Sequence, residues 1–350
     1  GENMKIRMMS VSIFCKYCVG LAMLLSAMPF IPGVCLAEST RVTIAVGGKA
    51  TLYYLPLTVA ERKGFFKEEG LDVSILDFPG GSKALQAMIG GSADVVSGGF
   101  DHTIMMQARG QFLTAFVVQG RTPAISLVVA KKREPEWSGP SVLKGWKIGV
   151  TAPGSSTNMF VNALLASVNL NTNQVSIIGV GTGQSAIAAI SAGHIDALAN
   201  IEPVVSILER DGLAREVVET MTAAGSQKVY GAAIPSASLY ATTKWIEKNP
   251  ETVTRLTRAI VKSLRWISAS TNEEIMAVLP EKNLMGDPKL FSMALDRQRL
   301  SFSLDGRFEA GVAEAALRAL ARFNNLSQSS IDIKKTYTNK FVDIVQKNSK

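Results

Sequence analysis

Short runs in which apolar and polar positions alternate are separated by stretches with helical spacing, and this order fills the first part of the chain. Residues 41–46 alternate as a strand, residues 55–63 show the apolar spacing of a helix, and residues 71–76 alternate again. A helix is expected at 83–89 and a buried strand at 93–97. Strands that alternate with helices predict a mostly parallel sheet.

The same order restarts after two further apolar strand candidates at 115–119 and 125–130. A strand is expected at 147–150, a helix at 158–168 and a strand at 175–178. The rest of the chain is predicted to be mainly helical and to pack on the first group of elements. Its expected helices lie at 250–268, 273–278, 288–298 and 310–323.

Two stretches that lie 102 residues apart are similar to one another. Gly81 of the first corresponds to Gly183 of the second, and Asp94 corresponds to Asp196. Each stretch is a glycine turn, an apolar helix, a Gly-x-x-Asp exit, a short apolar strand and another helix. We therefore expect one α/β unit to occur twice, as two lobes.

The predicted fold is α/β, with two lobes that are each a mostly parallel sheet flanked by helices. Two chain crossings form a hinge, and a ligand cleft lies between the lobes. We expect 38–131 to form the first part of lobe 1, 132–236 to form lobe 2, and 237–350 to return to lobe 1.

The first 37 residues differ from the remainder. Basic residues precede the apolar run 19–31, and small residues lead to Ala37, which is the pattern of a signal peptide cleaved after Ala37. A retained anchor helix is the alternative, but the apolar stretch is short and contains Pro29. All three cysteines lie in this segment, at positions 15, 18 and 35. Without them the exported chain has no disulfide or thiol nucleophile, which fits the periplasm.

The composition disfavours several classes of function. The net charge of +8 is mild and no dense basic run is present, so nucleic acid is not expected as a partner. His102 and His194 are the only histidines, and neither has a metal-ligand spacing. We expect a monomer with no catalytic residues, no metal and no cofactor.

Four segments carry a resemblance to a known family. They are 56–73 (PLTVAERKGFFKEEGLDV), 90–95 (GGSADV), 143–150 (LKGWKIGV) and the dipeptide Glu202-Pro203. They are similar to ABC-transporter substrate-binding proteins of the sulfonate, taurine, nitrate and thiamine-precursor group. The resemblance covers essentially all of the chain after residue 37. It implies the type II periplasmic binding fold and delivery of a captured solute to an ABC permease with its ATPase.

Glycine turns that open helices are the first candidates for ligand contacts. A helix N-terminus exposes unpaired backbone N–H groups and a partial positive charge, and therefore binds anions. Such turns occur at 80–82, 154–157 and 181–183. A simple cap is the alternative at each of them. The candidate ligand residues here are Gly81, Ser82, Gly154, Ser155, Ser156 and Thr182.

Further candidates lie near the first turn and at the hinge. The resemblance implies that the turn after the first strand borders the ligand, which adds Gly48, Thr51 and Tyr53. Gly99 would let the ligand approach the backbone, and Asp101 or His102 would face either the cleft or solvent. Arg121, Asn200 and Glu202 complete the set.

Arg121 and Glu202 suggest opposite ligand charges. A guanidinium at the hinge would bind an acidic group, although a surface charge is the alternative. Glu202 would accept from an amine or ring N–H, although it could instead brace the hinge. A solute with both kinds of group satisfies both residues.

Three functions remain open. The leading hypothesis is a solute receptor that closes on a small organic molecule and feeds a permease. A sensing receptor and a pyrimidine-biosynthesis-like enzyme are the alternatives. The glycine run at 179–183 lacks the third glycine of a dinucleotide fingerprint, and Ser155 lacks a G-x-S-x-G frame, so the enzyme reading has little support in motifs.

Overall fold

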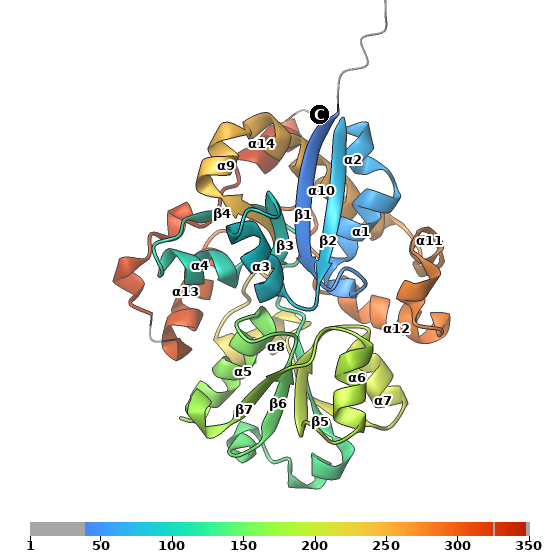
Figure 1. Cartoon of the computed structure of the whole chain (residues 1–350), viewed down its shortest axis with the longest axis vertical. Helices are drawn as coiled ribbons and strands as arrows, with labels where there is room; N and C mark the ends of the chain where they lie inside the picture. The colour runs from blue at the N-terminus through green and yellow to red at the C-terminus, as the bar shows by residue number, and fades with distance from the viewer. Residues whose placement is uncertain (1–38, 325, 348–350) are drawn as a thin grey trace, which may run out of the picture. The chain divides into compact units, whose positions relative to one another are not determined.

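The computed structural model describes residues 39–324 and 326–347, so the predicted signal peptide at 1–37 lies outside the described residues. Two five-stranded sheets organise this part of the chain (Figure 1). The first has the order β2-β1-β3-β10-β4, from Leu71–Phe78, Thr40–Gly47, Val95–Gly99, Ala237–Thr242 and Leu113–Val118. The second has the order β7-β6-β8-β5-β9, from Ser176–Gly179, Lys147–Val150, Ala197–Asn200, Ser126–Ala130 and Ala214–Glu219.

Each sheet is mostly parallel, as the alternation of strands and helices predicts. In the first sheet β1 pairs in parallel with β2 and β3, while β10 is antiparallel to β3 and β4. In the second sheet β5 is the antiparallel strand, between β8 and β9. The two sheets therefore share one topology, in which each lobe receives its antiparallel strand from a crossing of the chain.

The repeated sequence has the same structural role in both lobes. Asp94 accepts a hydrogen bond from the backbone N–H of Thr43 at 2.8 Å, and Asp196 accepts one from Lys147 at 2.9 Å. In both cases the carboxylate that precedes the third strand of the lobe holds the first strand. The prediction of a duplicated α/β unit is confirmed.

The helices of the two lobes follow the same order. Lobe 1 contains α1 (Leu55–Arg62), α2 (Phe65–Glu68), α3 (Gly81–Ile89) and α4 (Asp101–Gln107). Lobe 2 contains α5 (Ser156–Ser167), α6 (Gln184–Ser191), α7 (Val204–Arg210) and α8 (Ala223–Tyr230). The last helices are α9 (Thr243–Lys248), α10 (Pro250–Ala269), α11 (Asn272–Val278), α12 (Pro288–Arg299), α13 (Val312–Phe323) and α14 (Lys340–Lys347).

Two details differ from the sequence-based boundaries. Because β5 lies in the second sheet, the first crossing precedes Ser126, whereas residue 131 was expected. The apolar run at 125–130 gives no sign of which sheet it joins. The C-terminal helices also do not pack on lobe 1 alone, because α12 contacts α7 and α13 contacts α5.

The two crossings run beside one another. The backbone N–H of Ser236 donates to the carbonyl of Gly120, and Gly120 donates to the carbonyl of Ala237. The Ser236 hydroxyl also donates to the carbonyl of Thr122 at 2.5 Å. These bonds join the outgoing and returning segments into a two-stranded hinge next to the lobe boundary.

Candidate functional site

The N-termini of α3 and α5, one from each lobe, meet at the lobe boundary. Ser155 is the N-cap residue of α5, and its hydroxyl oxygen accepts from the backbone N–H of Ser82 at 2.9 Å. The Ser82 hydroxyl donates to the carbonyl of Pro153 at 2.9 Å. Two of the three helix starts that the sequence predicts as ligand contacts therefore lie together, and in this closed arrangement they bind one another.

Two glycines allow the lobes to approach closely. A Cβ on Gly99 would lie 2.1 Å from the hydroxyl oxygen of Ser156, and one on Gly48 would lie 2.5 Å from that of Thr182. Gly48 also has a φ of +99°, which other residues rarely adopt. These positions demand glycine because a backbone in one lobe faces a side chain in the other.

Asp101 lies in the same boundary. It is the first residue of α4 and follows β3 closely, so the open end of the sheet presents it toward lobe 2. One of its oxygens, Oδ1, accepts from the Ser156 hydroxyl at 2.7 Å. The other, Oδ2, is buried and has no hydrogen-bond partner.

The next residue in the chain, His102, and a residue of the same cavity, Tyr53, also have buried polar atoms that lack a hydrogen bond of ordinary geometry. Nε2 of His102 has no hydrogen-bond partner, and the hydroxyl of Tyr53, which has those of Ser236 and Ser156 nearby, forms no hydrogen bond of ordinary geometry. The other ring nitrogen of His102, Nδ1, shares a hydrogen bond of 2.7 Å with the hydroxyl of Tyr240. Buried polar groups without partners are rare, and three of the seven such atoms among the described residues lie here, which makes this part of the boundary the candidate ligand site.

Two small cavities, each of about 20 Å³, lie at the boundary and share Tyr53, Ile125 and Ser156. The first is lined mainly by hydroxyls and glycines: Gly47, Tyr54, Gly81, Thr151, Ser155 and Thr157, with Ile201. The second is mainly apolar: Pro123, Met159, Tyr230, Ile234, Pro235 and Leu320, with Asp101 and Ser236. Each volume is close to that of one water molecule. The lobes must separate for an organic ligand to enter.

The tyrosines around Asp101 respond to burial and to its charge. Burial raises the pKa of Tyr53, and the Asp101 carboxylate raises it further, while the hydroxyls of Ser236 and Ser156 act in the opposite direction. Burial is also the largest cause of the raised pKa values of Tyr54, Tyr230 and Tyr240, with Asp101 contributing to each. All four therefore stay neutral phenols.

Several predicted site residues lie at the boundary but have protein partners. The Thr51 hydroxyl donates to the carbonyl of Gly48 at 2.8 Å. Asn200 donates through Nδ2 to the carbonyl of Gly181 at 3.2 Å. The backbone N–H of Gly154 donates to Asn158 Oδ1. These contacts shape the turns, and ligand binding by these residues stays a prediction.

Arg121 points away from the two small cavities. Its Nε and Nη2 donate to the carbonyl of Leu300 at 3.3 and 3.2 Å. It lines a separate cavity of about 740 Å³ beside the hinge. Polar groups of that cavity have partners within the protein, since Arg307 pairs with Asp343 and its N–H donates to Asp305. The structure therefore places Arg121 apart from Asp101 and Ser155.

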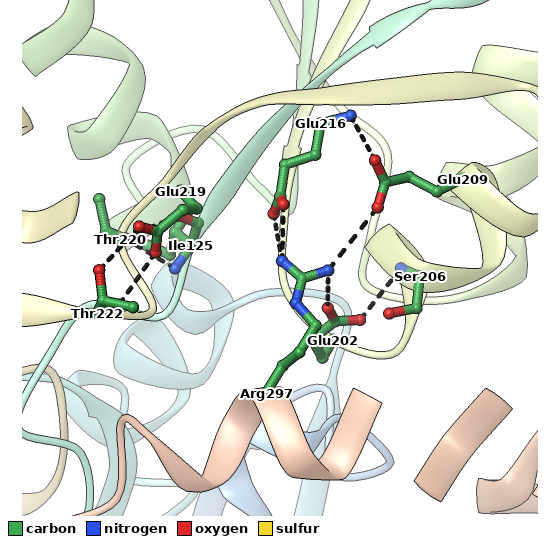
Figure 2. A network of polar contacts seen from close by, with 9 residues as sticks. All are labelled: Ile125, Glu202, Ser206, Glu209, Glu216, Glu219, Thr220, Thr222 and Arg297. Atoms are coloured by element: carbon green, nitrogen blue, oxygen red, sulfur yellow. Dashed lines mark hydrogen bonds and ion pairs between the residues drawn. The ribbon is translucent and has the colours of Figure 1, made fainter. Parts of the chain in front are cut away.

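Glu202 is buried beneath the boundary and is held by Arg297 of α12 (Figure 2). Its Oε1 lies 3.0 Å from Arg297 Nη1, and its Oε2 accepts from the backbone N–H of Ser206 at 3.1 Å. Desolvation raises the pKa of Glu202, although the Arg297 charge acts against this shift. The side chain lines neither small cavity.

Arg297 also binds two further carboxylates of lobe 2. Its Nη2 donates to both oxygens of Glu216, at 2.6 and 2.7 Å, and Nη1 lies 3.8 Å from Glu209. We call Arg297 with Glu202, Glu209 and Glu216 the arginine clasp. The arginine clasp agrees with the alternative role of Glu202, in which this residue braces the hinge region and does not bind the ligand. The sequence could not predict the clasp, because its members are up to 95 residues apart.

The site thus contains residues that sequence reasoning left open or missed. Asp101 and His102 could be placed at the end of a strand, but their direction could not. Tyr230 and Ser236 gave no signal, because an apolar run that contains a tyrosine or serine is typical of core, and Tyr54, in the predicted ligand turn, could equally be core. Among residues 39–324 and 326–347 there is no group of three acidic, histidine or cysteine side chains able to hold a metal, and no helix long and apolar enough to cross a membrane.

Comparison with known proteins matches residues 51–274 to the family model described as NMT1/THI5 like. A solved protein structure from Bordetella bronchiseptica RB50 is 48% identical, with a TM-score of 0.87, over 89% of this chain and 98% of that one. The alkanesulfonate-binding protein SsuA from Xanthomonas axonopodis pv. citri, solved with MOPS bound, has a TM-score of 0.65 at 18% identity, over 86% and 99%. These likenesses show the two-lobed type II periplasmic binding protein fold.

Curated relatives fall into two functional groups. YtlA of Bacillus subtilis (strain 168), named there as a candidate binding protein, is 23% identical over 288 residues, 82% of this chain and 83% of the relative. A 4-amino-5-hydroxymethyl-2-methylpyrimidine phosphate synthase of Aspergillus parasiticus is 24% identical over 313 residues, 87% of this chain and 88% of the relative.

Proposed function

Because the chain belongs to the NMT1/THI5-like family, we propose that it is the substrate-binding component of an ABC importer. It captures a small organic solute between its lobes and delivers it to a membrane permease with its ATPase. The observation that carries this proposal is the group of buried, unpartnered polar atoms on Tyr53, Asp101 and His102 at the lobe boundary. A receptor needs such groups to face its ligand, whereas a closed structural interface would pair them.

The geometry of the boundary supports capture by lobe closure. The contacts between Ser82 and Ser155 and between Asp101 and Ser156 join opposite lobes, while two adjacent crossings form the hinge. A ligand that binds groups of both lobes favours the closed state by its differential affinity. We place this activity in the periplasm, consistent with the predicted signal peptide and with the fold.

We propose that the ligand is a sulfonate, a taurine-like molecule, a carboxylate or a pyrimidine, the kinds of solute bound by the transporter proteins that the sequence resembles. The alkanesulfonate in the name of the Xanthomonas protein is the ligand of that protein, and it does not identify the ligand of this chain.

Native mass spectrometry of the freshly purified full chain tests the proposal. We expect a small molecule to co-purify, and small-angle scattering to show a smaller radius of gyration when it is returned to stripped protein. At a ligand concentration of about a hundred times Kd, binding should stabilise the fold by about 2.7 kcal/mol.

A pair of glycine variants provides a matched control. Gly99→Ala places a methyl group against Ser156 and Asp101, so closure and ligand binding should be lost. Gly183→Ala adds the same group at the N-terminus of α6, where nothing lies within 4 Å, and binding should be retained. Equal affinities in both variants, or no bound solute and no closure, would contradict the proposal.

A pyrimidine-synthase-like enzyme is the second candidate, and the fungal synthase relative is the observation that favours it. The two candidates differ in the fate of the ligand. A receptor releases the co-purified molecule chemically unchanged after prolonged incubation, whereas an enzyme converts it. A sensing receptor would bind the same solute but would associate with a signalling protein in place of a permease in a pull-down.

A further inference from the structure

Asp101 is a carboxylate without a cation. Of the ion pairs among the described residues none includes Asp101, and its Oδ2 has no partner of any kind. Neither of the two boundary cavities is lined by a lysine or an arginine. Burying a carboxylate is unfavourable unless a positive charge or several hydrogen bonds compensate for it. Asp101 receives one bond, from Ser156.

Two tyrosines share a cavity with Asp101. Tyr53 and Tyr230 line the cavity that contains Asp101, and the rings of Tyr53 and Tyr54 lie edge to face with centroids 4.8 Å apart. Aromatic faces attract cations, most strongly where water is excluded. A carboxylate flanked by tyrosines is therefore suited to a positively charged nitrogen.

Two of the anion-binding groups predicted from the sequence already have partners within the protein. The N–H of Ser82, at the start of α3, binds the hydroxyl of Ser155, and Arg121 binds the carbonyl of Leu300. Among the side-chain atoms at the boundary, the unpartnered ones are Asp101 Oδ2, which carries the negative charge, and the Tyr53 hydroxyl and His102 Nε2 beside it.

We infer that the cleft recognises a small organic cation, with its ammonium or amidinium group seated between Asp101 and the tyrosines. This inference rests on the proposed receptor function and narrows its range of ligands to those with a basic nitrogen, which excludes simple sulfonates and carboxylates. The hydroxyls of Ser155, Thr151 and Thr157 in the adjoining cavity would contact the rest of the molecule. A second, acidic group on the ligand is compatible with that polar side.

Titration calorimetry on the stripped full chain tests the inference with four probes. Tetramethylammonium and benzamidinium are cations, while methanesulfonate and acetate are anions of similar size. We expect heat of binding with at least one cation and none with the anions. The molecule that co-purifies should contain a basic nitrogen by mass spectrometry.

Two aspartate variants locate the effect. Asp101→Asn keeps the shape and an acceptor for Ser156, and should weaken binding of the cation at least tenfold. Asp72→Asn makes the same change on β2, where the side chain is 62% exposed, and should leave affinity within twofold. The melting temperature of both ligand-free variants should stay at or above that of the parent chain, which separates lost binding from lost folding.

The possible results distinguish a failure of the inferred ligand charge from a failure of the proposed receptor function. Binding of an anion without any cation, a co-purified acid without basic nitrogen, or unchanged cation affinity in Asp101→Asn overturns the inference and leaves the receptor function standing. Absence of any co-purified molecule together with absence of binding by all four probes overturns both.

Discussion

Two carboxylates at the lobe boundary, the buried Glu202 and the half-buried Asp101, have opposite surroundings. Glu202 is 1% exposed and its oxygens are shared between the Arg297 guanidinium and the backbone N–H of Ser206. Asp101 accepts one neutral hydroxyl and faces tyrosines, with its second oxygen unpartnered. The protein satisfies the first carboxylate itself and leaves the second for a ligand.

The largest effect on the difference between Glu202 and Asp101 is expected when Arg297 is replaced. Arg297→Met leaves Glu202 buried without its cation and leaves Glu209 and Glu216 close to it, so the free energy of unfolding should fall by about 3 kcal/mol, as for other broken buried ion pairs. Urea denaturation measures the loss. Adding Glu202→Gln to Arg297→Met should restore part of it, because the uncompensated charge is gone. If the double variant is as unstable as the single one, the loss arises from packing of α12 and the ionic account of the clasp fails.

The pH dependence of stability should separate Glu202 from a carboxylate with the opposite shift. Desolvation raises the pKa of Glu202 in the folded state, so its contribution to stability is complete below its unfolded pKa of about 4.3 and is lost as pH rises through the folded value. The stability difference between the parent chain and Glu202→Gln should therefore fall from pH 4 to pH 8, by at most about 1.4 kcal/mol per pH unit.

Asp196 provides the control for that experiment. Desolvation alone would raise the pKa of Asp196, but the backbone N–H of Lys147 and the guanidinium of Arg133 lower it overall. Its contribution is present above its unfolded pKa and is lost as pH falls through the folded value. The difference between the parent chain and Asp196→Asn should therefore grow as pH rises. Slopes of the same sign in the two variants would contradict the raised pKa of Glu202.

On the ligand side of the comparison, Ser155→Ala should weaken solute binding by about 1 kcal/mol, roughly fivefold, because the N–H of Ser82 loses its partner across the lobes. Titration calorimetry with the co-purified solute measures this. Ser167→Ala, at the other end of the same helix, removes a hydroxyl that binds only the carbonyl of Leu164, and affinity should not change. A twofold effect or less in Ser155→Ala would mean that the hydrogen bond between Ser82 and Ser155 does not stabilise the closed state.

The sequence predicted the fold well because its signals are local. Alternation, helical spacing and the Gly-x-x-Asp repeat each act within about a dozen residues, and the paired roles of Asp94 and Asp196 follow from that repeat. The first lobe boundary was misplaced because the run at 125–130 is apolar on both faces, as a strand in the middle of either sheet would be. Sheet membership is decided by distant partners such as β8 and β9.

The candidate site was predictable only in part. Helix-start positions such as Ser82 and Ser155 could be found, since caps and glycine turns are visible in sequence. The partners of Glu202 and Arg121 could not, because Arg297 and Leu300 come from a helix whose place beside lobe 2 no local pattern encodes. Glu202 thus has a charged partner within the protein and Arg121 a backbone carbonyl, while Asp101 has neither a cation nor a second hydrogen bond.

The smallest expected effect belongs to an ion pair that also joins α12 to lobe 2 but is open to water. Arg210 contacts Asp287 at 2.6 Å and Asp211 at 2.7 Å, with all three side chains at least 35% exposed. Exposed pairs gain little because water solvates the separated charges nearly as well. Arg210→Met should therefore leave the urea midpoint unchanged within error at 0.15 M salt, where Arg297→Met lowers it. If Arg210→Met lowers the urea midpoint as much as Arg297→Met does, the stabilisation by the arginine clasp comes from any ionic contact between α12 and lobe 2 and does not depend on the burial of Glu202.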